Sequence, residues 1–103
     1  MGFFKRTSVD VNEAWDRAGQ GALLIDVREK HEVRTGTPKG AVHIPMQRVE
    51  RRLSTLEGKE VLVICQSGNR SGRVTSYLRH QGIDAHNVRG GMISWRRAGL
   101  PTR

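Results

Sequence analysis

The chain has 103 residues, of which 36% are hydrophobic, and its 18 lysines and arginines exceed its 10 acidic residues for a formal net charge of +8. This length suits a single domain with a modest core, no apolar run approaches the ~20 residues that cross a membrane, and a lone cysteine excludes an internal disulfide and suits a reducing compartment. The positive excess favours anionic partners, but no aromatic residues interleave with the basic ones as a base-stacking platform for nucleic acid would require.

The first residues, 1–6, lack the longer apolar core of a signal peptide. They also miss the myristoylation pattern, because Arg6 stands where serine or threonine is required. We therefore expect a cytoplasmic protein. Residues 7–9 are predicted to form a short edge strand.

Asp10 has the features of a helix N-cap, with Glu13 three residues later in a variant of the capping box. The helix that follows is predicted to end at Gly19, because apolar residues recur at helical spacing: Val11, Ala14, Trp15 and Ala18. The apolar run 23–25 predicts a buried strand, which continues into charged residues from Asp26 onward.

Residues 29–41 are the least regular part of the chain, and one short helical turn is expected there. A brief strand is predicted at 41–44, where Pro45 stops it. A helix that Gly58 closes is predicted next, because apolar and charged residues fall on opposite faces. The apolar residues are Met46, Val49, Leu53 and Leu56, and the charged ones are Arg48, Glu50, Arg51 and Arg52.

Another buried strand is predicted at 61–64, a helix from about Ser71 to Gly82, and a last strand at 85–88. The pair Gly90-Gly91 then turns the chain into a final helix. The residues expected to face inward from the first of these helices are Val74, Tyr77 and Leu78, and the final helix carries Met92 and Trp95. Strands that alternate with helices predict one α/β domain over residues 1–103, with an open, mainly parallel five-stranded sheet and helices on both faces.

Cys65 follows the strand at 61–64 and precedes a short polar turn: Gln66, Ser67, Gly68, Asn69, Arg70 and Ser71. A strand that ends in cysteine, turns tightly and enters a helix aims backbone N–H groups at the sulfur. These donors, the helix dipole and Arg70 all favour thiolate over thiol. The sequence therefore predicts a nucleophilic sulfur. The plainer interpretation, a small buried core residue, does not explain the polar turn.

Asp26 and Arg28 are expected near this sulfur, because the carboxyl ends of parallel strands share the sheet edge where ligands bind. The alternative is that Asp26 is a structural hydrogen-bond acceptor and Arg28 its surface neighbour. Arg73, one helical turn further on, is a candidate rim cation for an entering oxyanion or else a solvated surface arginine. No metal site is predicted, because one cysteine and scattered histidines lack ligand spacing, and no cofactor is expected.

Taken together, these residues resemble a single-domain rhodanese, a thiosulfate sulfurtransferase, over nearly the whole chain. The likeness lies in segments that occur in the right order: Leu24 to Glu29, Gly40 to Pro45, Cys65 to Ser71, Val88 to Gly91 with Trp95, and Gly99-Leu100-Pro101. The chain departs from the family at residues 36–41, Gly-Thr-Pro-Lys-Gly-Ala, where the family often has Gly-His-Ile-Pro-Gly-Ala. This departure affects the shape of a local loop and leaves the sulfur site alone.

The resemblance implies a sulfurtransferase in which the Cys65 thiolate attacks the outer sulfur of thiosulfate, or of another anionic sulfur donor, and expels sulfite. The persulfide that remains would pass its terminal sulfur to cyanide or to a thiol acceptor. Carried over to this chain, backbone N–H groups of residues 66–71 would cradle the sulfur anion. Gly68 would allow the tight turn, and Arg70 would add positive charge and shape the loop.

Other functions remain open at this point. A cysteine-dependent phosphatase of similar fold has five residues between cysteine and arginine, whereas four separate Cys65 from Arg70, and no general acid is identifiable; an arsenate reductase is a comparable alternative. A Cys–His hydrolase needs an imidazole beside the sulfur, and no motif supplies one among His31, His43, His80 and His86. A non-enzymatic rhodanese-like module that binds partners or RNA is an alternative of another class, and a sulfur relay to a protein or to tRNA is also compatible.

Overall fold

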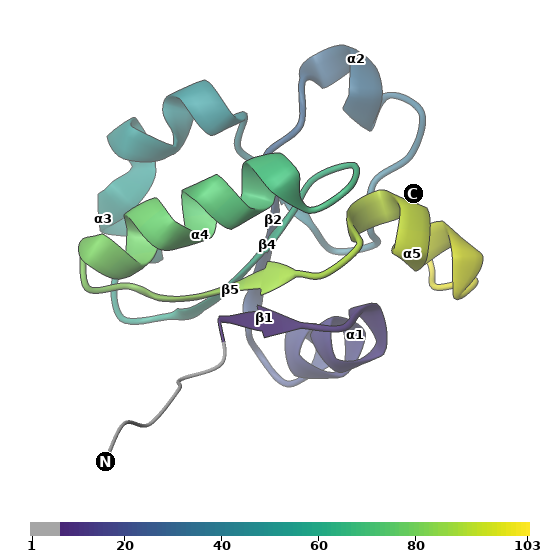
Figure 1. Ribbon diagram of the computed structural model, residues 1–103, viewed down its shortest axis with the longest axis horizontal. Coiled ribbons are helices and arrows are strands. Elements are labelled where there is room, and N and C mark those ends of the chain that lie inside the picture. The colour runs from purple at the N-terminus through teal and green to yellow at the C-terminus, as the bar shows by residue number, and fades with distance from the viewer. Residues whose placement is uncertain (1–6) are drawn as a thin grey trace.

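Five parallel strands form one sheet in the computed structural model, which describes residues 7–103 (Figure 1). The order across the sheet is β1-β5-β4-β2-β3. The strands are β1 (Ser8–Val9), β2 (Leu23–Asp26), β3 (Val42–His43), β4 (Glu60–Ile64) and β5 (Asp84–Val88). The predicted α/β class and the mainly parallel five-stranded sheet are confirmed. The predictions for residues 1–6 concern a segment outside the described part of the chain.

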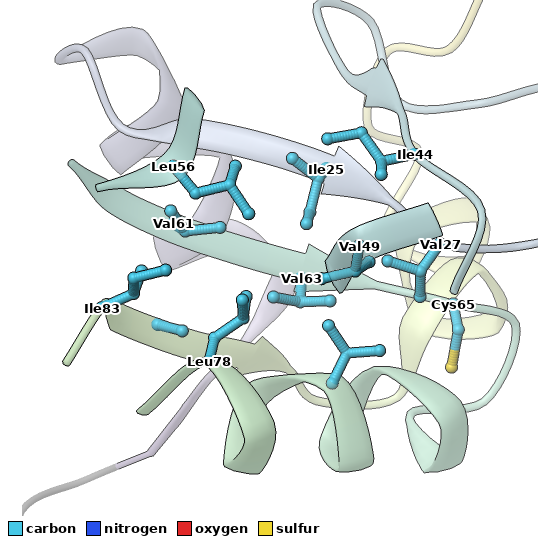
Figure 2. Close-up of a cluster of buried hydrophobic side chains, with 12 residues drawn as sticks. Ile25, Val27, Ile44, Val49, Leu56, Val61, Val63, Cys65, Leu78 and Ile83 are labelled. Carbon is cyan, nitrogen blue, oxygen red and sulfur yellow. The ribbon is translucent and has the colours of Figure 1, made fainter. Parts of the chain in front are cut away.

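Two apolar clusters cover the two faces of the sheet, because successive side chains of a strand point to opposite sides. In β4, Val61 and Val63 belong to the first cluster, and Leu62 and Ile64 belong to the second. All four are fully buried, so β4 is apolar from Val61 to Ile64, as expected for a central strand of a parallel sheet. Figure 2 shows the first cluster, with Cys65 at its edge.

Helices lie on both faces of the sheet, as predicted (Figure 1). The helix α4 (Asn69–His80), the 3₁₀ helix η1 (Met46–Arg52) and α3 (Leu53–Leu56) pack on the side of the first cluster. The helices α1 (Val11–Gly19) and α5 (Gly91–Arg97) pack on the other side, where the rings of Trp15 and Trp95 meet edge to face at 6.0 Å. The short α2 (Lys30–Val33) follows β2.

The sequence located most helix ends well. The Asp10 carboxylate accepts a hydrogen bond from the Glu13 N–H at 2.8 Å, which confirms the N-cap of α1. Two predictions need correction. The helix predicted over 46–56 is a 3₁₀ helix followed by one α-helical turn, because apolar spacing identifies a buried face but not the hydrogen-bonding pattern of so short a segment. The helix predicted from Ser71 begins at Asn69, directly after Gly68, whose φ of 104° is open to glycine at little cost.

Parallel pairing aligns the carboxyl ends of the central strands. Asp26 of β2 lies opposite Ile64 of β4, and Cys65 follows Ile64 directly. No helix within residues 7–103 combines the length and the apolar character that spanning a bilayer requires.

Candidate active site

Cys65 lies at the carboxyl end of β4, and only 1% of its surface is exposed. In Figure 2 its sulfur points toward the start of α4. The Sγ atom accepts hydrogen bonds from the Gly68 N–H at 3.1 Å, the Ser71 N–H at 3.3 Å and the Ser71 hydroxyl at 3.1 Å. Backbone donors do surround the sulfur, and the hydroxyl of Ser71 is a further donor that the sequence did not reveal.

These donors decide the protonation of the thiol. Burial by itself raises the pKa of Cys65, because a thiolate is poorly solvated in the protein interior. The hydroxyl of Ser71 and the backbone N–H groups of Ser71, Gly68 and Ser67 oppose this effect by stabilising the anion. Their combined contribution prevails, so the pKa of Cys65 lies below its ordinary value. A lowered pKa favours the thiolate, which is the form of cysteine that reacts as a nucleophile.

The loop between β4 and α4 is held from outside by α5. The Met92 N–H donates to the carbonyl of Cys65 at 2.9 Å, and the Ile93 N–H donates to the carbonyl of Gln66 at 3.2 Å. Gly91 permits this approach, because a Cβ there would lie 2.4 Å from the Cys65 carbonyl oxygen and 2.5 Å from that of Gln66. The carbonyls of Cys65 and Gln66 therefore point to α5, while the N–H groups of Gly68 and Ser71 face the sulfur.

Arg70 turns toward α2. Its Nη1 and Nη2 atoms lie 2.7 Å and 2.8 Å from the two carboxylate oxygens of Glu32. The Arg70 guanidinium lowers the pKa of the Glu32 carboxyl to about 2. The Glu32 carboxylate in turn raises the pKa of Arg70, and the charge of a thiolate at Cys65 adds to this effect.

Asp26 and Arg28 form a buried ion pair at this edge of the sheet. The Arg28 side chain donates to Asp26 through Nε at 3.0 Å and Nη2 at 2.8 Å, and both residues are at most 1% exposed. Thr37 donates its hydroxyl to the same carboxylate, and Arg28 also donates to the carbonyl of Gly36. Arg28 is thus not the surface neighbour that the structural alternative assumed. Among the described residues, none of these hydrogen bonds reaches Cys65, so a role at the sulfur stays a prediction.

The other predicted site residues differ in how exposed they are. Ser67 and Asn69 are exposed, and Gln66 is half-buried. Arg73 is exposed and lines a hollow of about 280 Å³ between η1 and α4, shared with Met46, Gln47, Val49, Glu50, Val74 and Tyr77. The lining of this hollow includes neither Cys65 nor residues 66–71, so both predicted roles of Arg73 stay predictions.

Asn87 is a site residue that the sequence did not indicate. From the end of β5, its amide contacts the Ser71 hydroxyl at 2.6 Å and the carbonyl of Gly68 at 3.2 Å. Glu32 was missed in the same way. Both lie far from Cys65 in sequence and reach the loop only through the strand order, so no local pattern signals them.

One cluster lies at the opposite end of the sheet. Ligand atoms of Glu60, Asp84 and His86 all fall within 4.8 Å of one another at the amino ends of β4 and β5. Arg17 contacts Glu60 at 3.1 Å, and Nε2 of His86 lies 3.0 Å from the Asp84 carboxylate, whereas Nδ1 of His86 is buried without a hydrogen-bond partner among residues 7–103. Sequence spacing alone did not reveal this grouping, in which Arg17 contacts Glu60 and His86 contacts Asp84.

Comparisons with known proteins agree with this geometry. The family model for the Rhodanese-like domain matches residues 10–98. The chain is 46% identical over 79 residues to the putative sulfurtransferase YtwF of Bacillus subtilis, covering 76% of this chain and 77% of that protein. It is 33% identical over 98 residues to the thiosulfate sulfurtransferase GlpE of Actinobacillus pleuropneumoniae, covering 92% and 91%.

Solved structures show the same architecture. A rhodanese-related protein from Thermoplasma volcanium superposes with a TM-score of 0.86 at 29% identity, over 96% of this chain and 98% of that one. A rhodanese-like domain protein from Staphylococcus aureus has a TM-score of 0.79 at 32% identity, over 86% and 90%. With its sheet order, its cysteine loop and these relatives, the chain belongs to the rhodanese-like domain family.

Proposed function

We propose that this protein is a sulfurtransferase that moves a sulfane sulfur from thiosulfate, or from a persulfide donor, to cyanide or a thiol acceptor through a persulfide on Cys65. The observation that carries the proposal is the set of three donors around a single buried sulfur. Its relatives named as sulfurtransferases support the same reaction class.

The reaction has two steps. The Cys65 thiolate attacks the outer sulfur of thiosulfate and forms a new S–S bond, while the original S–S bond breaks and sulfite leaves with its electron pair. Cyanide then attacks the terminal sulfur of the persulfide and leaves as thiocyanate, which returns the thiolate. This is covalent catalysis with two half-reactions, and no outside oxidant or reductant is needed.

The loop residues would act in this cycle by holding negative charge on sulfur. Fixed N–H donors stabilise an anion without reorganising at the moment of reaction. Gly68 and Ser71 supply these donors, and Arg70 adds positive charge from the side. Arg73 would meet the sulfite group of an approaching donor at the rim.

The phosphatase alternative is less well supported. A phosphoryl group offers three oxygens that call for two-point recognition by an arginine, but both terminal nitrogens of Arg70 are bound to Glu32. Asp26 is tied to Arg28 and Thr37, so it is poorly suited to serve as a general acid.

The acceptor is proposed only by class. A net charge of +8 favours an anionic acceptor and would also suit a sulfur relay that ends on tRNA or on an acidic protein. We expect the reaction in the cytoplasm, where thiols stay reduced. If a nucleic acid takes part, its binding to the protein should remain detectable at salt concentrations that abolish non-specific electrostatic binding.

Intact-mass measurement tests the proposal. The protein incubated with thiosulfate should gain the mass of one sulfur atom, and cyanide should remove it with one equivalent of thiocyanate formed. Cys65→Ser should show neither change. An unmodified mass after exposure to both thiosulfate and a persulfide donor would refute the proposal, whereas release of phosphate from an aryl phosphate would favour the phosphatase.

A further inference from the structure

The hydroxyl of Ser71 has two acceptors and one hydrogen. Its oxygen lies 3.1 Å from the Cys65 sulfur and 2.6 Å from Oδ1 of Asn87. A serine hydroxyl donates a single hydrogen bond at any moment. Ser71 is fully buried, so water cannot readily take the place of whichever partner is left without the hydrogen.

A hydrogen bond to the neighbouring loop fixes the orientation of the Asn87 amide, with its oxygen toward Ser71. Its Nδ2 donates to the carbonyl of Gly68 at 3.2 Å. A rotated amide would place two carbonyl-type oxygens against each other at Gly68. Asn87 is therefore fixed as an acceptor for the Ser71 hydroxyl and cannot donate to it instead.

The two protonation states of Cys65 use this arrangement differently. When Cys65 is a thiol, its S–H donates to the Ser71 oxygen, and the Ser71 hydroxyl donates to Oδ1 of Asn87. Each of the three side chains then has a hydrogen-bond partner. With a thiolate, the Ser71 hydrogen turns to the sulfur, and Oδ1 of Asn87 is left facing an oxygen without a hydrogen between them. The thiol form satisfies every group, and the thiolate form leaves one acceptor unpaired.

We propose that Asn87 is a positioning residue that competes with the Cys65 sulfur for the Ser71 hydroxyl and so restrains formation of the thiolate. The inference concerns the site on which the proposed function rests, but it stands on the geometry of three side chains. Its consequence for catalysis is that Ser71 donates to the sulfur while the sulfur is anionic. Ser71 returns to Asn87 when the inner sulfur is neutral, as in a persulfide whose charge lies on the outer atom.

Charged groups near the thiol do not provide this effect. Arg70, at the start of α4, acts on the thiolate from the side, and Glu32 of α2 compensates its charge. Among the described residues, neither Arg70 nor Glu32 forms a hydrogen bond with Ser71 or Asn87. A change at Asn87 therefore reaches the sulfur through Ser71.

The test measures the pKa of Cys65 from the rate of its alkylation across pH, without any sulfur donor. The variants Asn87→Ala and Asn87→Leu remove the competing acceptor, so the pKa should fall by about half a unit to one unit. Ser71→Ala should raise it by a similar amount. In the Ser71→Ala background, Asn87→Ala and Asn87→Leu should leave the pKa unchanged, and Asn12→Ala on the exposed face of α1 serves as the control.

The direction of the pKa change of Cys65 distinguishes this proposal from a purely structural role of Asn87. Loss of loop support would disorder the donors and raise the pKa of Cys65, so a rise or no change in both Asn87 variants overturns the proposal. A fall of equal size in the Ser71→Ala background also overturns it. Because alkylation requires no sulfur transfer, failure of the sulfurtransferase proposal would appear only in the mass measurement.

Discussion

Both terminal nitrogens of Arg70 contact the carboxylate of Glu32, at 2.7 Å and 2.8 Å, although the two residues are 38 positions apart. Glu32 also accepts from the Glu29 N–H at 3.0 Å, within the capping box of α2. The start of α4 is thus tied to the segment after β2 by one paired carboxylate, and the position of Arg70 beside the sulfur depends on a residue from another part of the chain.

The contribution of Glu32 to the free energy of unfolding should depend on pH, and replacing Glu32 with glutamine should show this. Since the folded state lowers the pKa of Glu32 from 4.5 to about 2, its stabilisation is complete above pH 4.5 and is lost as pH falls toward 2. We expect Glu32→Gln to reduce the free energy of unfolding by about 1 kcal/mol near neutral pH. The difference should vanish at the acid end. Urea unfolding at both pH values measures it, with exposed Glu57→Gln as the control; a difference that persists in acid would contradict the assignment.

The rate of sulfur loading should rise with pH and level off early. Only the thiolate attacks, and the loop donors lower the pKa of Cys65. The half-maximal rate should therefore fall below the pKa of ~8.5 of an ordinary cysteine. Stopped-flow loading with thiosulfate across pH measures this midpoint. A midpoint at or above the ordinary value would mean that burial outweighs the donors.

Gly91→Ala should disrupt the sulfur loop. Its new Cβ would lie 2.4 Å from the Cys65 carbonyl oxygen, and its φ of 57° is costly for any residue with a side chain. We expect a loss of about 3 kcal/mol or more in stability and slower sulfur loading in the protein that remains folded. Gly99→Ala is the matched control, because φ there is 69° but nothing lies within 4 Å of a Cβ, so only the backbone strain of about 1 kcal/mol applies. Equal losses for the two variants would show that the contact with the loop is unimportant.

Asp26→Asn should act on stability and leave the thiol unchanged. It leaves the buried charge of Arg28 without its partner, at a cost of about 3–5 kcal/mol. Pairing it with Arg28→Met removes both charges and should recover part of the loss. The alkylation profile of Cys65 should match that of the unaltered protein at a temperature where Asp26→Asn stays folded. A shifted profile would instead support the predicted role of Asp26 at the sulfur.

Arg73→Ala distinguishes a rim cation from a surface arginine. If Arg73 meets the incoming oxyanion, KM for thiosulfate should rise about three- to tenfold while kcat stays nearly constant, because binding of the ground state and of the transition state is weakened equally. Arg97→Ala, an exposed arginine on α5, should change neither constant. Steady-state kinetics at constant ionic strength measures both, and identical behaviour of the two variants would assign Arg73 to the solvated surface.

The sequence predicted the parts of this site that are contiguous. Cys65 and its loop follow one strand and enter one helix, so their local pattern was enough to place donors around the sulfur. Asp26 was expected at the same sheet edge for a similar reason, and it does lie opposite Ile64. Local pattern could not show that Arg28 turns inward to pair with it.

The contacts that the sequence did not reveal depend on packing between distant segments. Glu32, Asn87 and Gly91 reach the loop from α2, β5 and α5, and their positions follow from a strand order that places β4 between β5 and β2. The hydroxyl of Ser71 is a different case. Its residue was predicted as part of the loop, but local pattern could not show that its hydroxyl lies between the sulfur and the amide of Asn87.

Because Cys65 is buried, the size of the molecules that can approach its reactive sulfur differs between the free thiolate and the persulfide. With 1% of the residue exposed, the bare thiolate can be approached only by a slender group. A second sulfur on Cys65 would stand about 2 Å further out. Narrow reagents alone could then load the protein, whereas a recipient as bulky as another folded chain could collect the outermost atom. The burial of Cys65 would likewise keep large oxidants from the free thiol between turnovers.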